Sequence, residues 1–307
     1  MEHKTKINLL ILVIVGLFTV FSIPTFGFWK FQNYLDSKDQ TASELINFQH
    51  PQIPQVNSKQ KPQLQAQSAI IVDSQTNQVL YSQNSDQKIY PASVTKLATA
   101  VTALNIYPLN EVITVGSEYQ EGKVMELKTG ERITIKSLVE ALLVYSANDA
   151  AFNLANHHSG GQSEFIKEMN LISNKYGLKN THFTNYDGIH HPDHYSTVYD
   201  LSQLARLAIK NPVVREVVKN KNLTVVDIDK QYSHQLVSTN ELLGVVPEVQ
   251  GLKTGWTPEA GGCFVGLINL DGHELITVVA QSPDRFADTK NLINWLKESV
   301  VWQDYRP

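Results

Sequence analysis

Ser93 and Lys96 are the residues whose types and spacing point most directly to chemistry. A serine hydroxyl is a weak nucleophile that needs a neighbouring base, and a lysine can be that base if burial or a nearby cation keeps its amine partly neutral. If residues 93–105 form a helix, the three-residue spacing places both side chains on one helix face. The same spacing fits a helix-capping serine beside a lysine whose amine reaches water, so the pair alone leaves both interpretations open.

The position of Lys96 is unusual for a cation. The predicted helix begins near Ser93, so Lys96 lies in its first turn, where the helix dipole disfavours positive charge. The Ser-x-x-Lys pattern itself is common, because it recurs at Ser58–Lys61 and at Ser85–Lys88. Neither of these copies opens an apolar helix, and the context therefore singles out Ser93.

Two further motifs could complete a reactive site. Ser146-Ala-Asn148 lies between two predicted helices, where it could relay a proton and hydrogen-bond a substrate amide. Lys253-Thr-Gly255 leads into a predicted C-terminal hairpin, where a cation and a hydroxyl on an edge strand could bind a carboxylate. Both patterns also occur elsewhere: Ser-x-Asn recurs at Ser82 and Ser238, and Lys128-Thr-Gly130 is better explained as a hairpin turn.

The elements that must position these motifs follow from the apolar periodicity. Residues 68–81 predict two strands around a turn, and residues 262–270 and 273–280 predict a hairpin closed by Asp271-Gly272. Residues 97–110 carry no charge, so the helix over 93–105 should be buried nearly all round. Further helices are predicted at about residues 136–145, 149–157, 162–176, 199–210 and 285–300. With strands at both ends and helices between, the pattern indicates an α/β (α+β) fold in which the terminal strands share one antiparallel sheet.

Composition excludes several other classes of protein. The chain has 307 residues, a formal net charge of −4, one cysteine and 42% hydrophobic residues. These values are typical of a globular protein and argue against collagenous, coiled-coil or wholly disordered chains. A mildly acidic chain without a basic stripe is a poor nucleic-acid binder.

The N-terminal region predicts export. Lys4 and Lys6 precede an uncharged apolar run over residues 7–29, long enough to span a bilayer. We expect residues 1–30 to be a membrane signal-anchor, with a cleaved signal peptide and a secreted protein as the alternative. Residues 31–67 are rich in Gln and Pro and predict a flexible linker, which leaves residues 68–307 as the catalytic domain outside the cytoplasm.

The order of the three motifs is far more specific than each motif alone. Over about residues 68–300 the sequence resembles the low-molecular-mass penicillin-binding proteins, which are serine-type D-Ala-D-Ala carboxypeptidases. The resemblance rests on Tyr90-Pro-Ala-Ser-Val-Thr-Lys96, Leu143-Val-Tyr-Ser-Ala-Asn-Asp-Ala150, Thr181-His-Phe-Thr-Asn-Tyr-Asp-Gly188, His194-Tyr-Ser-Thr197 and Gly251-Leu-Lys-Thr-Gly-Trp-Thr257. It implies a β-lactamase/transpeptidase-like fold with a mostly helical insert.

The resemblance also implies a function. Ser93 would be acylated by the penultimate D-Ala of a peptidoglycan stem peptide, with Lys96 as the base and Ser146 as the proton relay to the leaving amine. Asn148 would bind the substrate amide, Lys253 and Thr254 the terminal carboxylate, and the N–H groups of Ser93 and Trp256, which follows Gly255, would form the oxyanion hole. Lys253, as a fixed cation, would lower the proton affinity of Lys96. No cofactor or metal is implied, and β-lactams are expected as covalent inhibitors.

Several alternatives remain at this stage. A D,D-endopeptidase that cuts peptidoglycan cross-links would use the same residues, and a non-catalytic β-lactam-sensing or wall-binding module would keep the same cleft. A class A β-lactamase would need a glutamate on the loop before the third motif, and residues 180–187 contain none. His190, His191 and His194 raise the possibility of a zinc site. Cys263 lies in an apolar strand and is expected to be a buried structural thiol.

Overall fold

The computed structural model describes residues 52–58 and 60–304. Residues 53–303 form one compact unit around a five-stranded antiparallel sheet with the strand order β3-β2-β10-β9-β8. Both terminal parts of this unit supply strands to the sheet, as the sequence predicts. The strands are β2 (Ser68–Asp73), β3 (Val79–Gln83), β8 (Val249–Thr257), β9 (Gly261–Leu270) and β10 (His273–Ser282).

The register of the sheet joins the two ends of the chain. In the antiparallel pair β10 and β2, Val278 lies opposite Ile70. The hairpin between β9 and β10 turns at Asp271 and Gly272, both with positive φ, which is the geometry that an Asp-Gly turn favours. Strand β8 forms one edge of the sheet, where its backbone can face a ligand.

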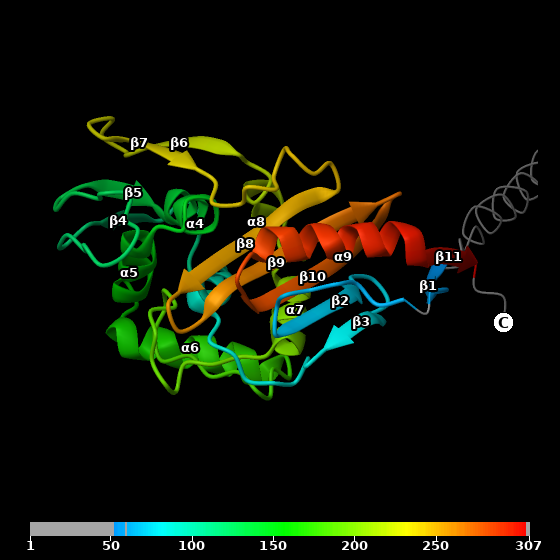
Figure 1. The fold of residues 1–307 in the computed structure, drawn as a ribbon. Coiled ribbons are helices and arrows are strands. Elements are labelled where there is room, and N and C mark those ends of the chain that lie inside the picture. The colour runs from blue at the N-terminus through cyan, green and yellow to red at the C-terminus, as the bar shows by residue number, and fades with distance from the viewer. Residues whose placement is uncertain (1–51, 59, 305–307) are drawn as a thin grey trace, which may run out of the picture. The chain divides into compact units, whose positions relative to one another are not determined.

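Helices cover both faces of the sheet (Figure 1). On one face lies α9 (Arg285–Ser299), which packs through Leu292 and Leu296 against a cluster that includes Phe264 on β9. The other face and the helical part share a larger core. Its helices are α3 (Lys96–Ile106), α4 (Ile135–Val144), α5 (Asn148–Asn156), α6 (Gly161–Lys175), α7 (Val198–Ala208) and α8 (Pro212–Val217).

Helix α3 is the buried helix that the charge-free segment predicts, because every residue from 96 to 103 is buried. Its start differs from the prediction. A short 3-10 turn, η1 (Ala92–Thr95), precedes α3, so Ser93 lies in the turn and Lys96 is the first α-helical residue. Ala92 has a φ of 48°, a conformation that costs a residue with a Cβ about 1–2 kcal/mol and sets the direction in which the chain enters the helix.

Three small two-stranded sheets complete the described fold. They are formed by β1 (Gln52–Val56) with β11 (Val300–Asp304), β4 (Val112–Thr114) with β5 (Arg132–Thr134), and β6 (Asn222–Val226) with β7 (Ser233–Val237). The Lys128-Thr-Gly130 segment makes a turn in which the Glu131 N–H donates to the Lys128 carbonyl, as predicted. The turn does not join two strands directly, because the paired strands β4 and β5 are connected by the longer segment 115–131.

The linker prediction was also wrong for its second half. Residues 52–56 form β1, and the residues that follow run along α9. The indole N–H of Trp295 donates to the Gln60 carbonyl at 2.7 Å, and the Asp288 carboxylate accepts the Gln65 N–H at 2.8 Å. These bonds fix an apolar-poor segment through its backbone, which a hydrophobicity pattern does not reveal.

The predicted membrane segment over residues 1–30 and the linker over 31–51 lie outside the described residues. Within residues 52–58 and 60–304, no helix combines the length and the apolar character needed to cross a bilayer.

Candidate active site

Ser93 and Lys96 are in direct contact. The Lys96 amine donates to Ser93 Oγ at 2.9 Å and to the Asp187 carbonyl oxygen at 2.6 Å. The Lys96 side chain is completely buried, whereas Ser93 is partly exposed. The structure therefore excludes the interpretation of Lys96 as a lysine that reaches water.

Burial changes the pKa of the Lys96 amine. It lowers the pKa of Lys96 to about 8, although the charges of Asp187 and Asp149 act to raise it. An amine with this pKa is partly neutral at physiological pH and can accept the Ser93 hydroxyl proton. Lys253, which the sequence analysis expected to lower this pKa, is not among the groups that shift it; burial lowers the pKa because it removes the charged ammonium form from water.

The third motif lies on the edge strand β8. Lys253 is buried and donates to its neighbouring carbonyl, that of Thr254, at 3.0 Å. Burial, followed by the positive charges of Lys96, Lys123 and Arg285, holds the pKa of Lys253 well below its usual range. The charged groups that shift the pKa of Lys253 are all cations, and a substrate carboxylate would supply a negatively charged partner. The site therefore suits an anionic ligand.

Gly255 brings β8 against the serine turn. A Cβ at this position would lie 2.9 Å from the Ser93 nitrogen and 3.0 Å from the Pro91 carbonyl oxygen, too close for any residue but glycine. This approach sets the backbone of β8 beside the amide of Ser93. The next residue, Trp256, pairs with Gly262 on β9 and exposes 61% of its surface. The arrangement is consistent with an oxyanion hole made by the two backbone N–H groups.

The second motif forms the turn between α4 and α5. Ser146 is buried with a φ of 70°, another conformation rare for a residue with a Cβ. Asn148 begins α5, where its N–H donates to the Lys123 carbonyl at 2.7 Å and its side-chain amide donates to the Glu121 carbonyl at 3.0 Å. Within the described residues no hydrogen bond joins Ser146 to Ser93 or Lys96.

Thr239, which the sequence analysis missed, connects the second and third motifs. Its N–H donates to the Val144 carbonyl at 3.2 Å, two residues before Ser146. Its hydroxyl lies 2.7 Å from the hydroxyl of Thr254. The Ser-x-Asn copy at Ser238 therefore marks a segment that supports the site, although the pattern alone did not say so.

The loop over residues 181–197 supports the serine turn from the other side. Gly188 has a φ of 87°, and a Cβ there would lie 1.9 Å from the Ala92 carbonyl oxygen. His194 is buried, with Nδ1 accepting the Thr184 N–H at 3.1 Å and Nε2 lying 2.7 Å from the Thr95 hydroxyl. Burial, reinforced by neighbouring positive charges, lowers the pKa of His194 to about 3.

These contacts occupy both ring nitrogens of His194, which leaves none to bind a metal. No cluster of three or more potential metal ligands occurs in the part of the chain that the structure describes. Cys263 is buried, as expected, and burial raises the pKa of its thiol to about 11.

Comparison with known proteins agrees with this geometry. The family described as D-alanyl-D-alanine carboxypeptidase matches residues 55–284. The chain belongs to this family. The matched residues span all three motifs and the Gly188 loop.

Individual relatives show how far the similarity extends. The D-alanyl-D-alanine carboxypeptidase DacF of Bacillus subtilis is 30% identical over 70% of this chain. The D-alanyl-D-alanine endopeptidase of Pseudomonas aeruginosa is 31% identical over 81% of this chain and 82% of its own length. The crystal structure of the Streptomyces K15 DD-transpeptidase superposes with a TM-score of 0.72 at 30% identity, covering 77% of this chain and 98% of that one.

The similarity to these structures confirms the predicted fold class, a mixed α and β fold with an antiparallel sheet. The chain spans 57% of the length of DacF.

Proposed function

We propose that the chain is a serine D-alanyl-D-alanine carboxypeptidase that removes the terminal D-Ala from peptidoglycan stem pentapeptides. The observation that carries this proposal is the buried Lys96 amine, hydrogen-bonded to Ser93 Oγ and held at a pKa of about 8. Family membership and the order of the three motifs support the substrate class.

The chemistry follows from the contacts. The Lys96 amine takes the hydroxyl proton as Ser93 Oγ bonds to the carbonyl carbon of the penultimate D-Ala. The negative charge on the carbonyl oxygen is stabilised by the N–H groups of Ser93 and Trp256. The carbon–nitrogen bond to the terminal D-Ala then breaks, and that amine leaves with a proton relayed through Ser146. Water hydrolyses the ester and restores the Ser93 hydroxyl.

Binding uses the cations and amides around the serine. Lys253 and Thr254 hold the terminal carboxylate, and Asn148 hydrogen-bonds the peptide backbone. Because Lys253 is buried, its interaction with a bound carboxylate is weakly screened by solvent. A penicillin presents a carboxylate and a reactive amide in a similar arrangement, so β-lactams should acylate Ser93.

The experiment that tests this function measures D-Ala release. The full chain is incubated with an acyl-D-Ala-D-Ala peptide, with Ser93→Ala as the matched control. The proposal expects one D-Ala per peptide cleaved and none with the variant. An unchanged rate in Ser93→Ala would overturn the assignment.

A second candidate, D,D-endopeptidase activity, is favoured by the similarity to the Pseudomonas aeruginosa endopeptidase. Both activities use the same nucleophile and differ in whether the leaving amine belongs to a free D-Ala or to a cross-linked peptide. A cross-linked muropeptide dimer tested in parallel distinguishes them, because only an endopeptidase converts it to monomers.

We also propose that residues 1–30 tether the protein to the cell membrane with the catalytic domain outside the cytoplasm. The apolar run over 7–29 behind Lys4 and Lys6 supports this proposal. The mass of the native N-terminus and the distribution between membrane and soluble fractions test it. An intact N-terminus in the membrane fraction is expected, whereas a truncated soluble protein would indicate a cleaved signal and secretion.

A further inference from the structure

The segment over residues 121–128, here called the 121–128 segment, lies against the start of α5. Two of its carbonyls, those of Glu121 and Lys123, accept hydrogen bonds from Asn148. Two of its N–H groups, those of Met125 and Leu127, donate to the two carboxylate oxygens of Asp149 at 3.0 and 3.1 Å. The position of the segment and the position of Asn148 are therefore coupled.

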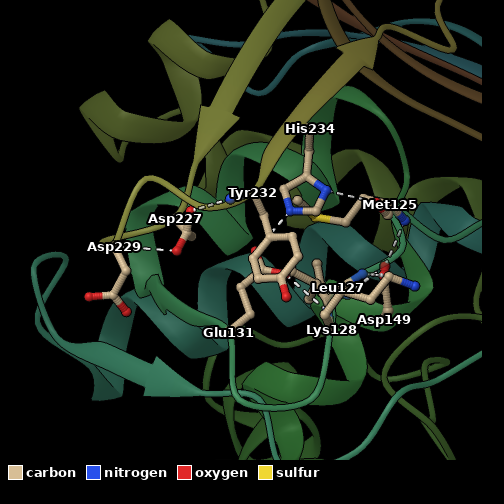
Figure 2. A network of polar contacts seen from close by, with 10 residues as sticks. Met125, Leu127, Lys128, Glu131, Asp149, Asp227, Asp229, Tyr232 and His234 are labelled. Atoms are coloured by element: carbon tan, nitrogen blue, oxygen red, sulfur yellow. Dashed lines mark hydrogen bonds and ion pairs between the residues drawn. The ribbon is translucent and has the colours of Figure 1, made fainter.

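His234 on β7 holds the same segment from the opposite side (Figure 2). Its Nδ1 lies 2.9 Å from the Met125 carbonyl oxygen, and its Nε2 lies 2.8 Å from Glu131 Oε1. The second oxygen of Glu131 accepts the Lys128 N–H at 3.0 Å. The Glu131 side chain is completely buried and that of His234 is 9% exposed.

The partners of His234 define its protonation. A backbone carbonyl oxygen can only accept a hydrogen bond, and an ionised carboxylate can only accept as well. Both ring nitrogens must therefore donate, which makes His234 an imidazolium paired with the Glu131 carboxylate.

The groups around His234 favour its protonated form. Burial opposes the charge on His234, but the hydrogen bond and charge of Glu131, the Met125 carbonyl and the charge of Asp149 outweigh it and raise the pKa of His234. The other polar or charged residues that line the space beside it are Glu126, Lys128, Tyr145, Tyr232, Ser233 and Gln235.

The 121–128 segment packs into the larger core through Met125 and Leu127, but towards β7 it borders a cavity. A cavity of about 350 Å³ lies between the segment and β7, lined by Met125, Tyr145 and His234 among others. Because an open cavity offers few van der Waals contacts, the hydrogen bonds of His234 are what span the gap. Tyr145, on the same cavity, directly precedes Ser146.

We propose that His234 and Glu131 are positioning residues for substrate binding, whose shared proton holds the 121–128 segment against Asn148. When the proton is lost, one of the two ring nitrogens of His234 no longer carries a hydrogen to donate to the oxygen that it faces. The segment then separates from β7, and Asn148 loses its fixed position. Binding of the peptide weakens, while the Ser93–Lys96 chemistry is unchanged. This inference rests on the proposed function.

The test compares the native full chain with His234→Gln, Glu131→Gln and the control His273→Gln. The glutamine at 234 keeps a hydrogen-bonding side chain but cannot carry the proton. His273 lies at the start of β10, where it stacks on Trp302 with ring centroids 4.2 Å apart, away from the three motifs. KM and kcat for D-Ala release are measured from pH 6 to 10, and hydrogen–deuterium exchange of the 121–128 segment is measured alongside.

We expect His234→Gln and Glu131→Gln to raise KM about tenfold at neutral pH with kcat within about twofold, and the exchange of the 121–128 segment to rise relative to α3. In the native chain KM should rise at alkaline pH more steeply than in His234→Gln, where only the loss of the Lys253 charge remains to weaken binding. His273→Gln should behave as the native chain. An unchanged KM and exchange in both variants would overturn the proposal, as would exchange that rises uniformly across the chain.

The exchange measurement does not depend on the enzymatic activity. If neither peptide substrate is cleaved, the proposed function fails, yet protection of the 121–128 segment that is lost at alkaline pH still supports the His234–Glu131 pair. If a variant does not fold, the pH dependence of exchange in the native chain decides: protection that is unchanged from pH 6 to 10, after correction for the intrinsic rate, overturns the proposal.

Discussion

The Lys96 amine lies 2.9 Å from Ser93 Oγ on a side chain with no exposed surface. In this position the amine can accept the Ser93 hydroxyl proton, which is the role we propose for it. Its second hydrogen bond, to the Asp187 carbonyl, fixes the direction in which it points.

Replacing the base should abolish acylation. Lys96→Met keeps the length and apolar part of the side chain but removes the amine, and we expect the first-order acylation rate with penicillin to fall at least about 10³-fold. Stopped-flow measurement at saturating penicillin checks this, with circular dichroism to confirm folding. An acylation rate within tenfold of the native chain would contradict the role of Lys96.

The acylation rate should rise with pH. Burial lowers the pKa of Lys96 to about 8, and only the neutral amine accepts a proton. Acylation should therefore be slow below pH 7, where most of the amine is protonated, and its rate should reach a plateau above about pH 9, where most of it is neutral. The rate at saturating penicillin isolates this step from binding. A rate that is flat or falls across this range would rule out Lys96 as the group that titrates.

Gly188 and Gly130 provide a matched pair for the packing of the serine turn. Their φ values are 87° and 88°, but a Cβ at 188 would lie 1.9 Å from the Ala92 carbonyl oxygen, whereas at 130 it meets nothing within 4 Å. Gly130→Ala should cost only the backbone strain, about 1–2 kcal/mol, and keep the acylation rate. Gly188→Ala should cost more stability and slow acylation at least about tenfold, because it displaces Ser93. Equal effects in urea unfolding and in acylation would contradict this account.

Lys253 should matter most for substrates with a free carboxylate. In Lys253→Ala, kcat/KM for an acyl-D-Ala-D-Ala peptide should fall about 10²-fold, while the amidated analogue, already a poor substrate, should lose little further. Kinetics on the two peptides measure the difference. Similar losses on both would show that Lys253 acts on the fold or on Ser93 rather than on the carboxylate.

His194 should make stability depend on pH in the acid range. Its pKa is lowered from 6.5 to about 3, so between these values the unfolded chain binds a proton that the folded chain does not. Stability should therefore fall as the pH falls, by up to about 1.4 kcal/mol per pH unit from this residue. His194→Gln should remove this part of the slope in denaturant unfolding between pH 6 and 4. An identical slope in both proteins would contradict a buried neutral His194.

The strongest periodic patterns predicted the fold well. The absence of charge over residues 97–110 correctly indicated a buried helix, and the Asp271-Gly272 turn correctly indicated the β9–β10 hairpin. Both follow from local rules, namely burial of a charge-free segment and the φ > 0 that an Asp-Gly turn adopts. The pairing of β2 with β10 followed only from the fold-level rule that strands bury their apolar faces together.

Other features were not accessible from the sequence pattern. The 3-10 turn at Ala92–Thr95 depends on a positive φ at Ala92, which is held by the close approach of Gly188 and Gly255 from distant parts of the chain. The hairpin of β6 and β7 and its His234 were missed because polar and apolar residues alternate there without turn signals that decide their partners. Lys96 binds the backbone carbonyl of Asp187. Every residue has such a carbonyl, so residue types cannot indicate which one accepts the hydrogen bond.

The site residues divide in the same way. The pairing of Ser93 with Lys96 was predicted from their spacing, and the structure shows the hydrogen bond. Of the two causes considered for a lowered Lys96 pKa, burial is the one that acts, and the expected effect of Lys253 is not seen. The roles of Ser146 and Asn148 remain predictions.

The most direct measurement of the central claim is the intact mass of the full chain after exposure to penicillin, with peptide mapping of the adduct and Ser93→Ala alongside. The account predicts a single added penicilloyl group on the peptide that contains Ser93, and none in the variant. An adduct on another residue, or an equal adduct in Ser93→Ala, would contradict the assignment of Ser93 as the nucleophile.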